Sequence, residues 1–496
     1  MNVREFLQVL PGVQLRAGGE RKVSALCFDS RTLSGDCVFV AVRGGKVDGH
    51  QFLVEAASKG AAALIVEDPA NVPADYPGAV AVVPNTRVAL NKLAARFYGN
   101  PADKLFCVGV TGTNGKTTTT YMVEAIFSQG RRPAGVIGTI DHHFKQEVWK
   151  TDMTTPDPVS FQSRLRNFVD LGAKSVALEV SSHALRQSRV DEVPFDVAVF
   201  TNLSRDHLDY HTDMEDYFDA KNKLFRDLLS NSKKPKPTAV INADDEYGRR
   251  IQVGSNVRLW YYGPNSGSHI RYTIQTSGFS GSRFQLATPV GNRDFSIRMV
   301  GLHNVANACA AIGAGLAADL SMDAIAQALG TLNGVSGRLE AVPNKRGVHI
   351  FVDYAHTDDA IQTVLHHLDQ IRKGTRLKNK IITVFGCGGD RDSGKRPLMM
   401  KAALKYSDYV VLTSDNPRTE DPEKILDDAM AGAPAGSLDK TIFRNADRKQ
   451  GIAKAIELAN EDDVILIAGK GHEDYQQIGT TKYPFSDIQV VKELLK

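Results

Sequence analysis

The chain has 496 residues, of which 42% are hydrophobic and 24% are charged, with a net charge of +3. This length exceeds one ordinary hydrophobic core and predicts roughly three domains, and the near balance of charge gives no support to a nucleic-acid partner. The five cysteines have no CxxC spacing, and four lie in or beside apolar runs, which favours buried free thiols over disulfides. No apolar run reaches the roughly 18 residues of a membrane span, so we expect a soluble, cytoplasmic protein without a transmembrane segment.

The first 100 or so residues are predicted to form a small α/β domain. Apolar residues at helical spacing alternate with short apolar runs that are typical of buried strands. The expected helices lie at 3–10, 51–59 and 87–97, and the expected strands lie at 23–28, 37–42, 61–66 and 79–83. Ser30 stands in the segment Asp29-Ser30-Arg31 after the first strand, where it could contact a ligand or belong to an ordinary turn.

A glycine-rich segment between a strand at 105–110 and a helical pattern predicts a phosphate-binding loop. Its glycines let the backbone approach phosphate oxygens, and the following helix N-terminus presents amide N–H groups to them. Lys116 would neutralise the β- and γ-phosphates, and the Thr117 hydroxyl would bind Mg²⁺. Val110 stands where the standard motif has glycine, so a turn that only links strand to helix is the alternative. The loop residues are Gly112, Thr113, Asn114, Gly115, Lys116, Thr117 and Thr118.

Two polar side chains follow the next buried strands of the same predicted sheet. Glu179 ends a strand at 175–178, and His207 lies shortly after a strand at 197–201. The carboxyl ends of parallel strands form the edge where α/β sheets bind ligands, so Thr117, Glu179 and His207 could meet at one magnesium ion. Mg²⁺ prefers oxygen ligands, so the alternative for His207 is a hydrogen-bonded histidine at that edge.

A helix is predicted over 214–229, and Lys221 lies on its apolar stripe. The simplest interpretation is that the lysine stem packs while its amine reaches solvent. The alternative is chemical modification of a neutral, desolvated amine. Farther along, alternating runs predict a β-rich segment over 256–300, and Asn304 is expected to cap the N-terminus of an alanine-rich helix at 305–316.

The last third of the chain predicts a second doubly wound sheet. Four apolar strands each end in a polar, glycine-rich or charged turn, which indicates a separate site at their carboxyl ends. The glycine turn at 386–389 does not have the GxGxxG spacing of a dinucleotide site. The expected strands lie at 349–352, 380–385, 409–413 and 463–468.

Ten motifs make the chain similar to the Mur ligase family over nearly its whole length, and most similar to members that add the third amino acid in peptidoglycan synthesis. They are DSR at 29–31, TGTNGKTTTT at 111–120, EVSSHAL at 179–185, TNLSRDHLDYH at 201–211, GLHNVAN at 301–307, GRLE at 337–340, DYAHT at 353–357, FGCGGDRDSGKRP at 385–397, DNPRTEDP at 415–422 and AGKGHEDY at 468–475.

This resemblance implies an α/β protein of three domains. They are a small N-terminal α/β domain for a UDP-sugar at residues 1–100, a central P-loop-type ATPase sheet domain at 101–335, and a C-terminal Rossmann-like doubly wound domain for an amino acid at 336–496. The implied protein is a cytoplasmic, monomeric ligase that uses ATP and Mg²⁺. Its implied substrates are UDP-N-acetylmuramoyl-L-alanyl-D-glutamate and meso-2,6-diaminopimelate.

The implied reaction begins when ATP phosphorylates the γ-carboxylate of D-glutamate. The amine of diaminopimelate then attacks the acyl phosphate through a tetrahedral intermediate. A carboxylate is a poor electrophile, and phosphorylation supplies the leaving group that it lacks. The protein mainly positions the reactants and neutralises charge.

The resemblance also implies roles for individual residues. The nucleotide contacts are Gly112 to Thr118, Asn304, Arg338 and Asp353, the last two contributed by the third domain. The magnesium ligands are Thr117, Glu179, His207 and Lys221, with Lys221 carbamylated, and Lys116 joins Glu179, His207 and Lys221 in the catalytic set. The contacts to the UDP-sugar peptide are Ser30, Thr154, Thr155, Ser181, Gln187 and Arg189. The amino-acid contacts are Arg391, Asp415, Asn416, Pro417, Arg418, Gly469 and Glu473.

Three alternatives differ from this implied function. The first two are a lysine-adding relative and a folylpolyglutamate synthase; the DNPR turn and the UDP-sugar motifs argue against both. Lysine-adding relatives typically lack the arginine that stands here as Arg418, whose turn Pro417 would stiffen. The third is a P-loop switch or motor protein, which would hydrolyse nucleotide without an acceptor. The family's second UDP-binding segment corresponds here to Gly45-Lys46-Val47, where the assignment stays open.

Overall fold

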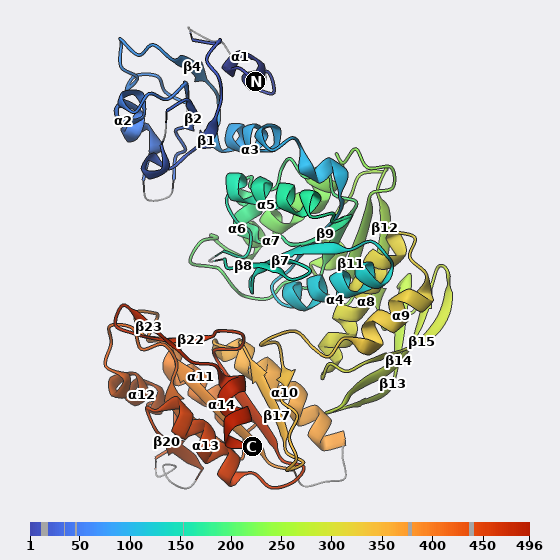
Figure 1. The fold of residues 1–496 in the computed structure, drawn as a ribbon. Helices are drawn as coiled ribbons and strands as arrows, with labels where there is room; N and C mark the ends of the chain where they lie inside the picture. Colours follow the sequence, from blue (N-terminus) through green and yellow to red (C-terminus); the bar gives the residue numbers. More distant parts are fainter. Residues whose placement is uncertain (11–17, 34, 45–46, 152, 375–378, 436–440) are drawn as a thin grey trace. The chain divides into compact units, whose positions relative to one another are not determined.

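The computed structural model describes residues 1–10, 18–33, 35–44, 47–151, 153–374, 379–435 and 441–496 (Figure 1). These residues form two compact units. Unit 1 contains Met1–Tyr272, Ala287–Gly291 and Ala306–Ala328, and unit 2 contains Thr273–Leu286, Asn292–Val305 and Leu329–Lys496. Within these ranges, every helix is too short or too polar to span a bilayer.

The first part of unit 1 is a four-stranded parallel sheet with helices on both faces. Its strands pair in the order β1-β2-β3-β4. Successive side chains of a strand point to opposite faces, so along β2 Val38 packs with α1 and α3 while Phe39 packs with α2. The elements are α1 (Val3–Leu7), β1 (Ala25–Cys27), β2 (Cys37–Val40), α2 (Leu53–Ser58), β3 (Ala63–Val66), β4 (Ala79–Val82) and α3 (Thr86–Phe97).

The central sheet of unit 1 has the strand order β12-β11-β10-β5-β9-β6-β7-β8. The strands from β12 to β6 are parallel, and β7 and β8 add an antiparallel edge. Its strands are β5 (Phe106–Thr111), β6 (Ala134–Ile137), β7 (His142–Phe144), β8 (Glu147–Trp149), β9 (Ser175–Glu179), β10 (Val197–Phe200), β11 (Thr238–Asn242) and β12 (Arg258–Gly263).

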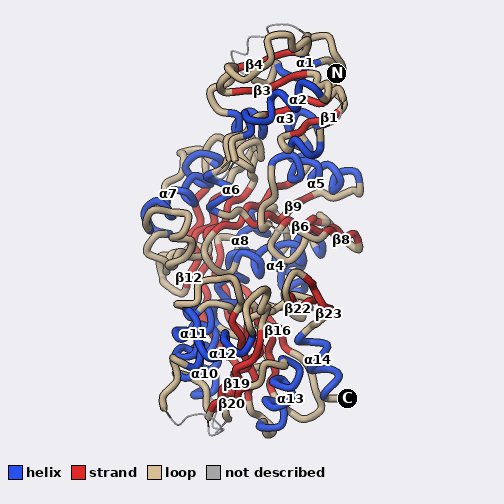
Figure 2. The backbone as a smooth tube through the Cα atoms, turned by 90° about the vertical axis from the view of Figure 1, so that its left-hand side faces the viewer, coloured by secondary structure: helices blue, strands red, loops and turns tan. Residues whose placement is uncertain are grey.

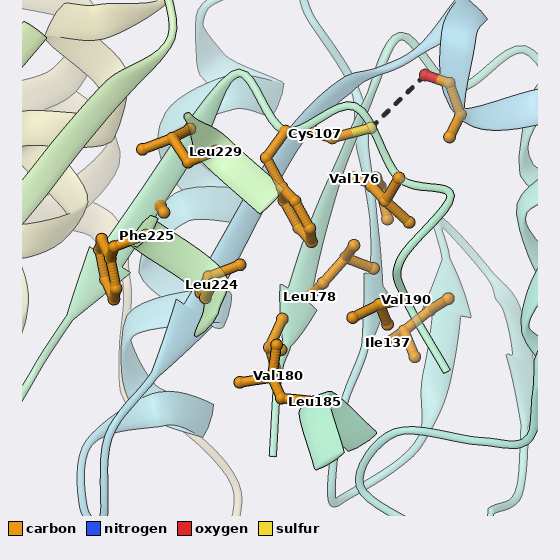
Figure 3. Close-up of a cluster of buried hydrophobic side chains, with 14 of the residues drawn as sticks. Cys107, Ile137, Val176, Leu178, Val180, Leu185, Val190, Leu224, Phe225 and Leu229 are labelled. Carbon is orange, nitrogen blue, oxygen red and sulfur yellow. Dashed lines mark hydrogen bonds between the residues drawn. The ribbon is translucent and has the colours of Figure 1, made fainter. Parts of the chain in front are cut away.

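Helices bury the apolar side chains of this central sheet. Figure 3 shows one such cluster, in which Cys107 of β5 and Leu178 of β9 lie with Phe225 and Leu229. The helices of this region are α4 (Lys116–Gln129), α5 (Pro158–Asp170), α6 (Ser182–Arg186), α7 (Met214–Lys223), a π-helical turn (Leu224–Leu229), α8 (Leu302–Ala317) and α9 (Met322–Thr331), and α8 and α9 each cross a boundary between the units.

Unit 2 contains a doubly wound sheet of order β16-β17-β21-β18-β19-β20, parallel except for β16. Helices α10, α11 and α12 cover one face of it, and α13 and α14 cover the other (Figure 2). The strand order runs outward from β18 to β20, and the chain then returns to insert β21 between β17 and β18. In doubly wound sheets, ligands bind outside the carboxyl ends of the strands at the point where the strand order reverses.

The strands of this sheet are β16 (Glu340–Ala341), β17 (His349–Asp353), β18 (Ile381–Cys387), β19 (Tyr409–Ser414), β20 (Ile442–Arg444) and β21 (Val464–Ala468). The other elements are α10 (Asp358–Gly374), α11 (Lys395–Leu404), α12 (Pro422–Met430), α13 (Arg448–Leu458), α14 (Asp487–Leu494), the hairpin β22 (Tyr475–Ile478) and β23 (Thr481–Pro484), and the strands β13 (Ile270–Gly278), β14 (Gly281–Thr288) and β15 (Gly291–Ile297).

One local prediction is wrong, and one is confirmed. The alanine-rich helix begins at Leu302, so Asn304 lies in its first turn and is not the N-cap. Gly301, with a φ of 95°, makes the left-handed turn that starts the helix three residues earlier, and the Asn304 amide donates to the Val300 carbonyl at 2.8 Å. The five cysteines are all free and buried, as their apolar surroundings predict.

A buried ion pair supports the two strands that end at the candidate site of unit 2. Arg448 of α13 donates to both carboxylate oxygens of Asp487, each at 2.7 Å, and both side chains are 0% exposed. The same guanidinium donates to the carbonyls of Ser414 and Ala468, the last residues of β19 and β21. Arg448 thus joins helix α14 to the ends of the two strands that flank β18.

We expect Arg448→Met to lower the free energy of unfolding by about 3–5 kcal/mol, because it leaves the Asp487 carboxylate buried without a partner. Lys449→Met is the matched control, since Lys449 pairs with Glu493 across the same two helices at side chains that are 53% and 54% exposed. That change should cost no more than about 1 kcal/mol. Urea denaturation measures both, and equal losses in the two variants would contradict the prediction.

Candidate active site

The loop between β5 and α4 needs glycine at two positions. Gly112 and Gly115 have φ values of 144° and 84°, which L-residues rarely adopt. A Cβ at Gly112 would collide with the side chain of Thr201, and one at Gly115 would collide with that of Asn307. The backbone can therefore turn tightly here and present its amides beside the start of α4.

The segment after β10 supports this loop. Thr113 N–H donates to the Asn202 carbonyl at 2.8 Å, and Asn114 N–H donates to Asn202 Oδ1 at 3.0 Å. The Thr201 hydroxyl donates to the Asn114 carbonyl at 2.6 Å. The sequence reasoning missed Thr201 and Asn202 as supports of the loop, although their position directly after a buried strand was the available signal.

The first turn of α4 carries the charged and hydroxyl groups of the loop. Lys116 Nζ donates to the carbonyls of Gly112 and Thr113 at 2.9 and 2.8 Å. Thr117 and Thr118 follow it in the same turn and are buried. A helix N-terminus that projects amide N–H groups next to a lysine suits a phosphate group.

Glu179 lies at the same sheet edge as this loop. In the pairing of β5 with β9, Glu179 is level with Val110, and in that of β5 with β10, Thr111 is level with Phe200. The Glu179 carboxylate is fully buried and is held by Thr139, whose N–H and hydroxyl donate to its two oxygens at 2.9 and 3.0 Å. Thr139 is a second support that the sequence reasoning missed.

His207 lies on the segment after β10 with a left-handed φ of 53°. Its ring lies 5.1 Å from that of His183 and 5.9 Å from that of Tyr217, measured between centroids. Burial lowers the pKa of His207 from its ordinary value; nearby Asp206 opposes this effect and Lys116 adds to it, and the net lowering favours the neutral imidazole at neutral pH. A neutral imidazole is the form that can bind a metal.

Within the described ranges, no group of three or more His, Cys, Asp or Glu side chains could hold a metal ion. A cation here would therefore draw on hydroxyl, phosphate and water oxygens besides Glu179. That ligand set suits Mg²⁺, which usually keeps several waters and uses one or two carboxylates together with substrate phosphates. The Thr117 hydroxyl and the Glu179 carboxylate fit this requirement.

Lys221 does not reach solvent, so the interpretation of an exposed amine is wrong. The residue is 1% exposed, its Nζ donates to the Gly112 carbonyl at 2.9 Å, and Nζ lies 4.5 Å from the centroid of the Tyr217 ring. Burial, and next the charge of Lys116, hold the pKa of Lys221 well below its usual value. Lys221 is therefore a desolvated amine directly beside the glycine-rich loop.

The residues that the resemblance assigns to the UDP-sugar peptide form one connected group beside Glu179, except Ser30. The Thr155 hydroxyl donates to the Glu179 carbonyl at 2.7 Å, and Ser181 N–H donates to that hydroxyl at 3.2 Å. The remaining bonds join Thr154 to Thr139, Arg189 to the Thr155 carbonyl, and Arg189 to Gln187.

Ser30 lies apart, in a short 3₁₀ helix after β1, and no hydrogen bond joins it to this group in the described part of unit 1. Gly45 and Lys46 lie outside the described residues.

Arg338 and Asp353 lie together in unit 2. The Asp353 carboxylate is buried and accepts from the N–H groups of Leu339 and Ala355 at 2.6 and 2.8 Å. Burial raises its pKa from the usual value. The Arg338 guanidinium lies 5.2 Å from the centroid of the Tyr354 ring. Asn304, the third residue of this predicted set, also belongs to unit 2.

A second group of polar residues gathers at the carboxyl ends of β18, β19 and β21. Asn416 Nδ2 donates to Glu473 Oε2 at 2.9 Å. Asp415 and Glu473 also bond to Lys470, which the sequence reasoning missed although it lies inside the AGKGHEDY motif. Gly469, with a φ of 116°, turns the chain after β21. This group joins two turns that are far apart in the sequence.

Arg418 lies in the turn after β19 in a left-handed conformation, with a φ of 51°. Its Nη1 donates to the Gly389 carbonyl at 2.7 Å, and among the described residues no carboxylate forms an ion pair with its guanidinium. A partly buried arginine without a carboxylate partner can receive a carboxylate from a ligand.

Two further residues of the predicted amino-acid site lie nearby in the chain. Pro417 precedes Arg418, and the Pro417 carbonyl packs against Gly389. Arg391 is exposed on the loop after β18.

Three family models match the chain one after another. The Mur ligase family catalytic domain matches residues 22–98, the Mur ligase middle domain matches 110–315, and the Mur ligase glutamate ligase domain matches 337–471. With the parallel sheets described above, these matches confirm the predicted α/β architecture of three domains.

Curated relatives match the chain over nearly its full length. The UDP-N-acetylmuramoyl-L-alanyl-D-glutamate–2,6-diaminopimelate ligase of Geobacter metallireducens is 44% identical over 491 residues, which cover 96% of this chain and 95% of that protein. The protein of the same name from Aquifex aeolicus is 44% identical over 475 residues, which cover 96% and 94%.

Solved structures agree with these relatives. A structure of a UDP-N-acetylmuramoyl-L-alanyl-D-glutamate–2,6-diaminopimelate ligase has a TM-score of 0.72 and 31% identity, covering 100% of this chain and 98% of the other. The MurF ligase of Thermotoga maritima in complex with ADP has a TM-score of 0.59 at 21% identity, covering 96% and 97%, and supports the fold alone. With three matching models and relatives that are 44% identical, the chain belongs to the Mur ligase family.

Proposed function

We propose that this protein is an ATP-dependent ligase that joins meso-2,6-diaminopimelate to UDP-N-acetylmuramoyl-L-alanyl-D-glutamate in peptidoglycan synthesis. The observation that carries the proposal is the full-length match, at 44% identity, to relatives that bear this name. The arrangement of the residues supports it. A glycine-rich loop with Lys116 shares a sheet edge with Glu179, and unit 2 has a separate group of acidic and basic side chains around Arg418.

The loop Gly112 to Thr118 would hold the phosphates of ATP, and Asn304, Arg338 and Asp353 would contact the nucleotide. Thr117, Glu179, His207 and a carbamate on Lys221 would hold Mg²⁺. When bound, Mg²⁺ neutralises phosphate charge and so makes the γ-phosphoryl group easier to attack. Lys116 contributes to the same neutralisation from the first turn of α4.

The reaction has two steps. An oxygen of the D-glutamate γ-carboxylate attacks the γ-phosphorus of ATP, and the bond from that phosphorus to the bridging oxygen breaks, so that ADP leaves. The amine of diaminopimelate then attacks the acyl carbon, loses a proton and expels inorganic phosphate. The group of Thr154, Thr155, Ser181, Gln187 and Arg189 would position the UDP-sugar peptide, and Ser30 would contact its UDP-sugar end.

Arg418 would select the amino acid. Diaminopimelate differs from lysine by one carboxylate at the end far from the attacking amine, and a planar guanidinium binds a carboxylate through two hydrogen bonds. Arg391, Asp415, Asn416, Gly469 and Glu473 would complete the site, with Pro417 stiffening the turn that carries Arg418. Lysine would leave the guanidinium without its anionic partner, at a cost of roughly 2–5 kcal/mol.

A phosphate-release assay with diaminopimelate and lysine side by side tests the proposed function. We expect release to require the UDP-sugar dipeptide and diaminopimelate, with lysine a poor substitute. Arg418→Ala should raise the KM for diaminopimelate by about 30-fold or more and leave the KM for ATP nearly unchanged. The control is Arg444→Ala, which removes a half-buried arginine of the same domain that pairs with the exposed Glu423 and Asp427.

The result decides between the alternatives. Phosphate release without either acceptor would favour a P-loop hydrolase, and equal use of lysine would exclude Arg418 as the specificity residue.

We further propose domains at 1–100, 101–335 and 336–496, and a monomeric protein in the cytoplasm with no nucleic-acid partner. Light scattering of the purified protein tests the monomer.

A further inference from the structure

Lys470 lies in the turn after β21, within the group of polar residues at the carboxyl ends of β18, β19 and β21. Its side chain is 0% exposed. Nζ lies 3.3 Å from Asp415 Oδ1, 3.1 Å from Asn416 Oδ1 and 3.1 Å from Glu473 Oε2. An ammonium group has three N–H donors, so these three acceptors satisfy it completely. The three partners are all residues that the proposed function places in the amino-acid site.

These bonds join two turns that neither strand order nor local sequence connects. Asp415 is 55 residues from Lys470 along the chain and follows β19, whereas Lys470 and Glu473 follow β21. The two strands are separated in the sheet by β18. Arg448 holds the ends of both strands from below, through the carbonyls of Ser414 and Ala468. Lys470 therefore links the two turns, together with the bond from Asn416 Nδ2 to Glu473 Oε2.

The bonds leave one oxygen of each carboxylate for a ligand. Lys470 uses Asp415 Oδ1 and Glu473 Oε2, and among the described residues no protein group donates to Asp415 Oδ2 or Glu473 Oε1. The Asp415 and Glu473 side chains are 12% and 17% exposed, so both can be reached from solvent. Two carboxylates and one ammonium leave a net charge of one negative unit in this group.

We propose that Lys470 is a positioning residue of the amino-acid site, which orients Asp415 and Glu473 and cancels one of their two charges. The site then presents one negative charge, and this charge matches one ammonium group of the incoming amino acid. Arg418 supplies the positive charge for the neighbouring carboxylate of the same substrate. The inference rests on the proposed function, because it takes Asp415, Glu473 and Arg418 as contacts of the amino acid.

A buried lysine that only stabilises the turns would have the same contacts, so the test needs a property that differs between the two roles. Without Lys470, two carboxylates face each other, and their repulsion favours the uptake of a proton by one of them. Amino-acid binding in that variant should then be weak at high pH, where both carboxylates are ionised, and recover as the pH falls, because the uptake of one proton restores the single negative charge. A defect caused only by loosened turns would not depend on pH in this way.

Other titratable groups lie near the two carboxylates. They are Arg448 from α13, Tyr354 after β17, Cys387 at the end of β18, Tyr475 on β22, and His472, which precedes Glu473 and lies 5.1 Å from the Tyr354 ring between centroids. Arg448 is paired with Asp487, and burial raises the pKa of the Cys387 thiol to about 12 and that of Tyr354 above its usual value. The variant-to-wild-type ratio of kcat/KM for diaminopimelate cancels the ionisation of the substrate, and of protein groups that titrate equally in both proteins.

The experiment measures kcat and KM for diaminopimelate and the KM for ATP in full-length protein, from about pH 6 to about pH 8.5. Lys470→Met keeps the length of the side chain and removes its charge. We expect its KM for diaminopimelate to rise roughly 30-fold or more near neutral pH, while the KM for ATP changes less than about threefold. The variant-to-wild-type ratio of kcat/KM for diaminopimelate should decrease with pH.

Two further variants keep the outcome decisive. Lys470→Arg retains the charge and should recover much of the lost affinity. Lys470→Met combined with Glu473→Gln removes the repulsion, so its loss should be smaller than the product of the two single losses and should no longer vary with pH. The control is Lys482→Met, which removes an exposed lysine of β23, over the Tyr475 ring, and should leave both KM values unchanged.

A Lys470→Met variant with the wild-type KM and pH profile would overturn the inference. Unfolding of both Lys470→Met and the double variant, while Glu473→Gln alone folds, would show that Lys470 serves only the fold. If wild type releases no phosphate on addition of diaminopimelate, the proposed function itself fails. The two failures are therefore distinguished within one assay.

Discussion

Lys116→Ala is expected to reduce ligation by about 100- to 1,000-fold, the scale for removing one group that stabilises charge developing in a transition state. Lys116 begins α4, and its amine lies at the loop, bonded to the carbonyls of Gly112 and Thr113. Bound ATP would offer this amine phosphate oxygens in place of those carbonyls. Without the lysine, the negative charge of the transferring phosphoryl group is less well balanced, so we expect a loss mainly in kcat.

Lys174→Ala is a suitable control for this change, because Lys174 is an exposed lysine of the same unit. Thermal unfolding should show that both variants keep the wild-type fold, and a phosphate-release assay should show that only Lys116→Ala is impaired. Since the phosphate loop would act on ATP and not on the amino acid, the KM for diaminopimelate should hardly change. Wild-type turnover by Lys116→Ala would remove the phosphate-binding interpretation of the loop.

Lys221→Ala is expected to lower activity by about 100-fold or more, on the same scale, and to be partly rescued by a short carboxylic acid such as acetate. Lys221 is buried, bonded to the Gly112 carbonyl, and forms no ion pair with a carboxylate within the described residues. A buried cation without a counter-charge is costly, and the neighbouring Lys116 increases that cost. The amine is therefore predisposed to be neutral, which is the form that reacts with carbon dioxide.

Carbamylation forms a bond between the amine nitrogen and the carbon of carbon dioxide and releases one proton. The product is an anion near Lys116, so the two groups attract each other, and its oxygens suit Mg²⁺. Acetate diffusing into the space left by Lys221→Ala would supply a similar carboxylate. Lys223→Ala on the same helix is the control, because Lys223 already pairs with Asp191 and should show no rescue.

Carbamylation also has a readout that does not depend on activity. Protein incubated with ¹³C-labelled bicarbonate should give a carbamate carbon signal that is absent from Lys221→Ala and present in Lys223→Ala. If that signal is missing from wild type, or if acetate fails to restore Lys221→Ala, the amine acts in its unmodified form.

Several features of this protein follow from its sequence because they depend on neighbours only a few residues away. An apolar strand followed directly by two glycines and a Lys-Thr pair predicts the β5–α4 turn, since the steric demands of such a turn are local. Runs of apolar residues bounded by polar turns likewise predict the parallel strands of both sheets. The Mur ligase family was recognisable from ten motifs for the same reason.

The start of the alanine-rich helix was less predictable, although it too is local. Asn304 is a favourable N-cap residue, and the apolar pattern begins at Val305. In the structure Gly301 already turns the chain, and helix α8 starts at Leu302. Helix ends depend on small differences among several neighbouring residues, which the periodicity of the pattern does not reveal.

Tertiary structure alone decided the environment of the chemically important side chains. The helical pattern placed Lys221 on an apolar stripe, but it could not show whether the amine is buried. In the structure the amine contacts the Tyr217 ring and the carbonyl of Gly112, which is 109 residues away in the chain. The bonds from Thr139 to Glu179, and from Lys470 to Asp415 and Glu473, likewise join segments that are close only in the folded sheet. Burial and charge pairing depend on every group within a few ångströms, and the fold, not the local sequence, brings those groups together.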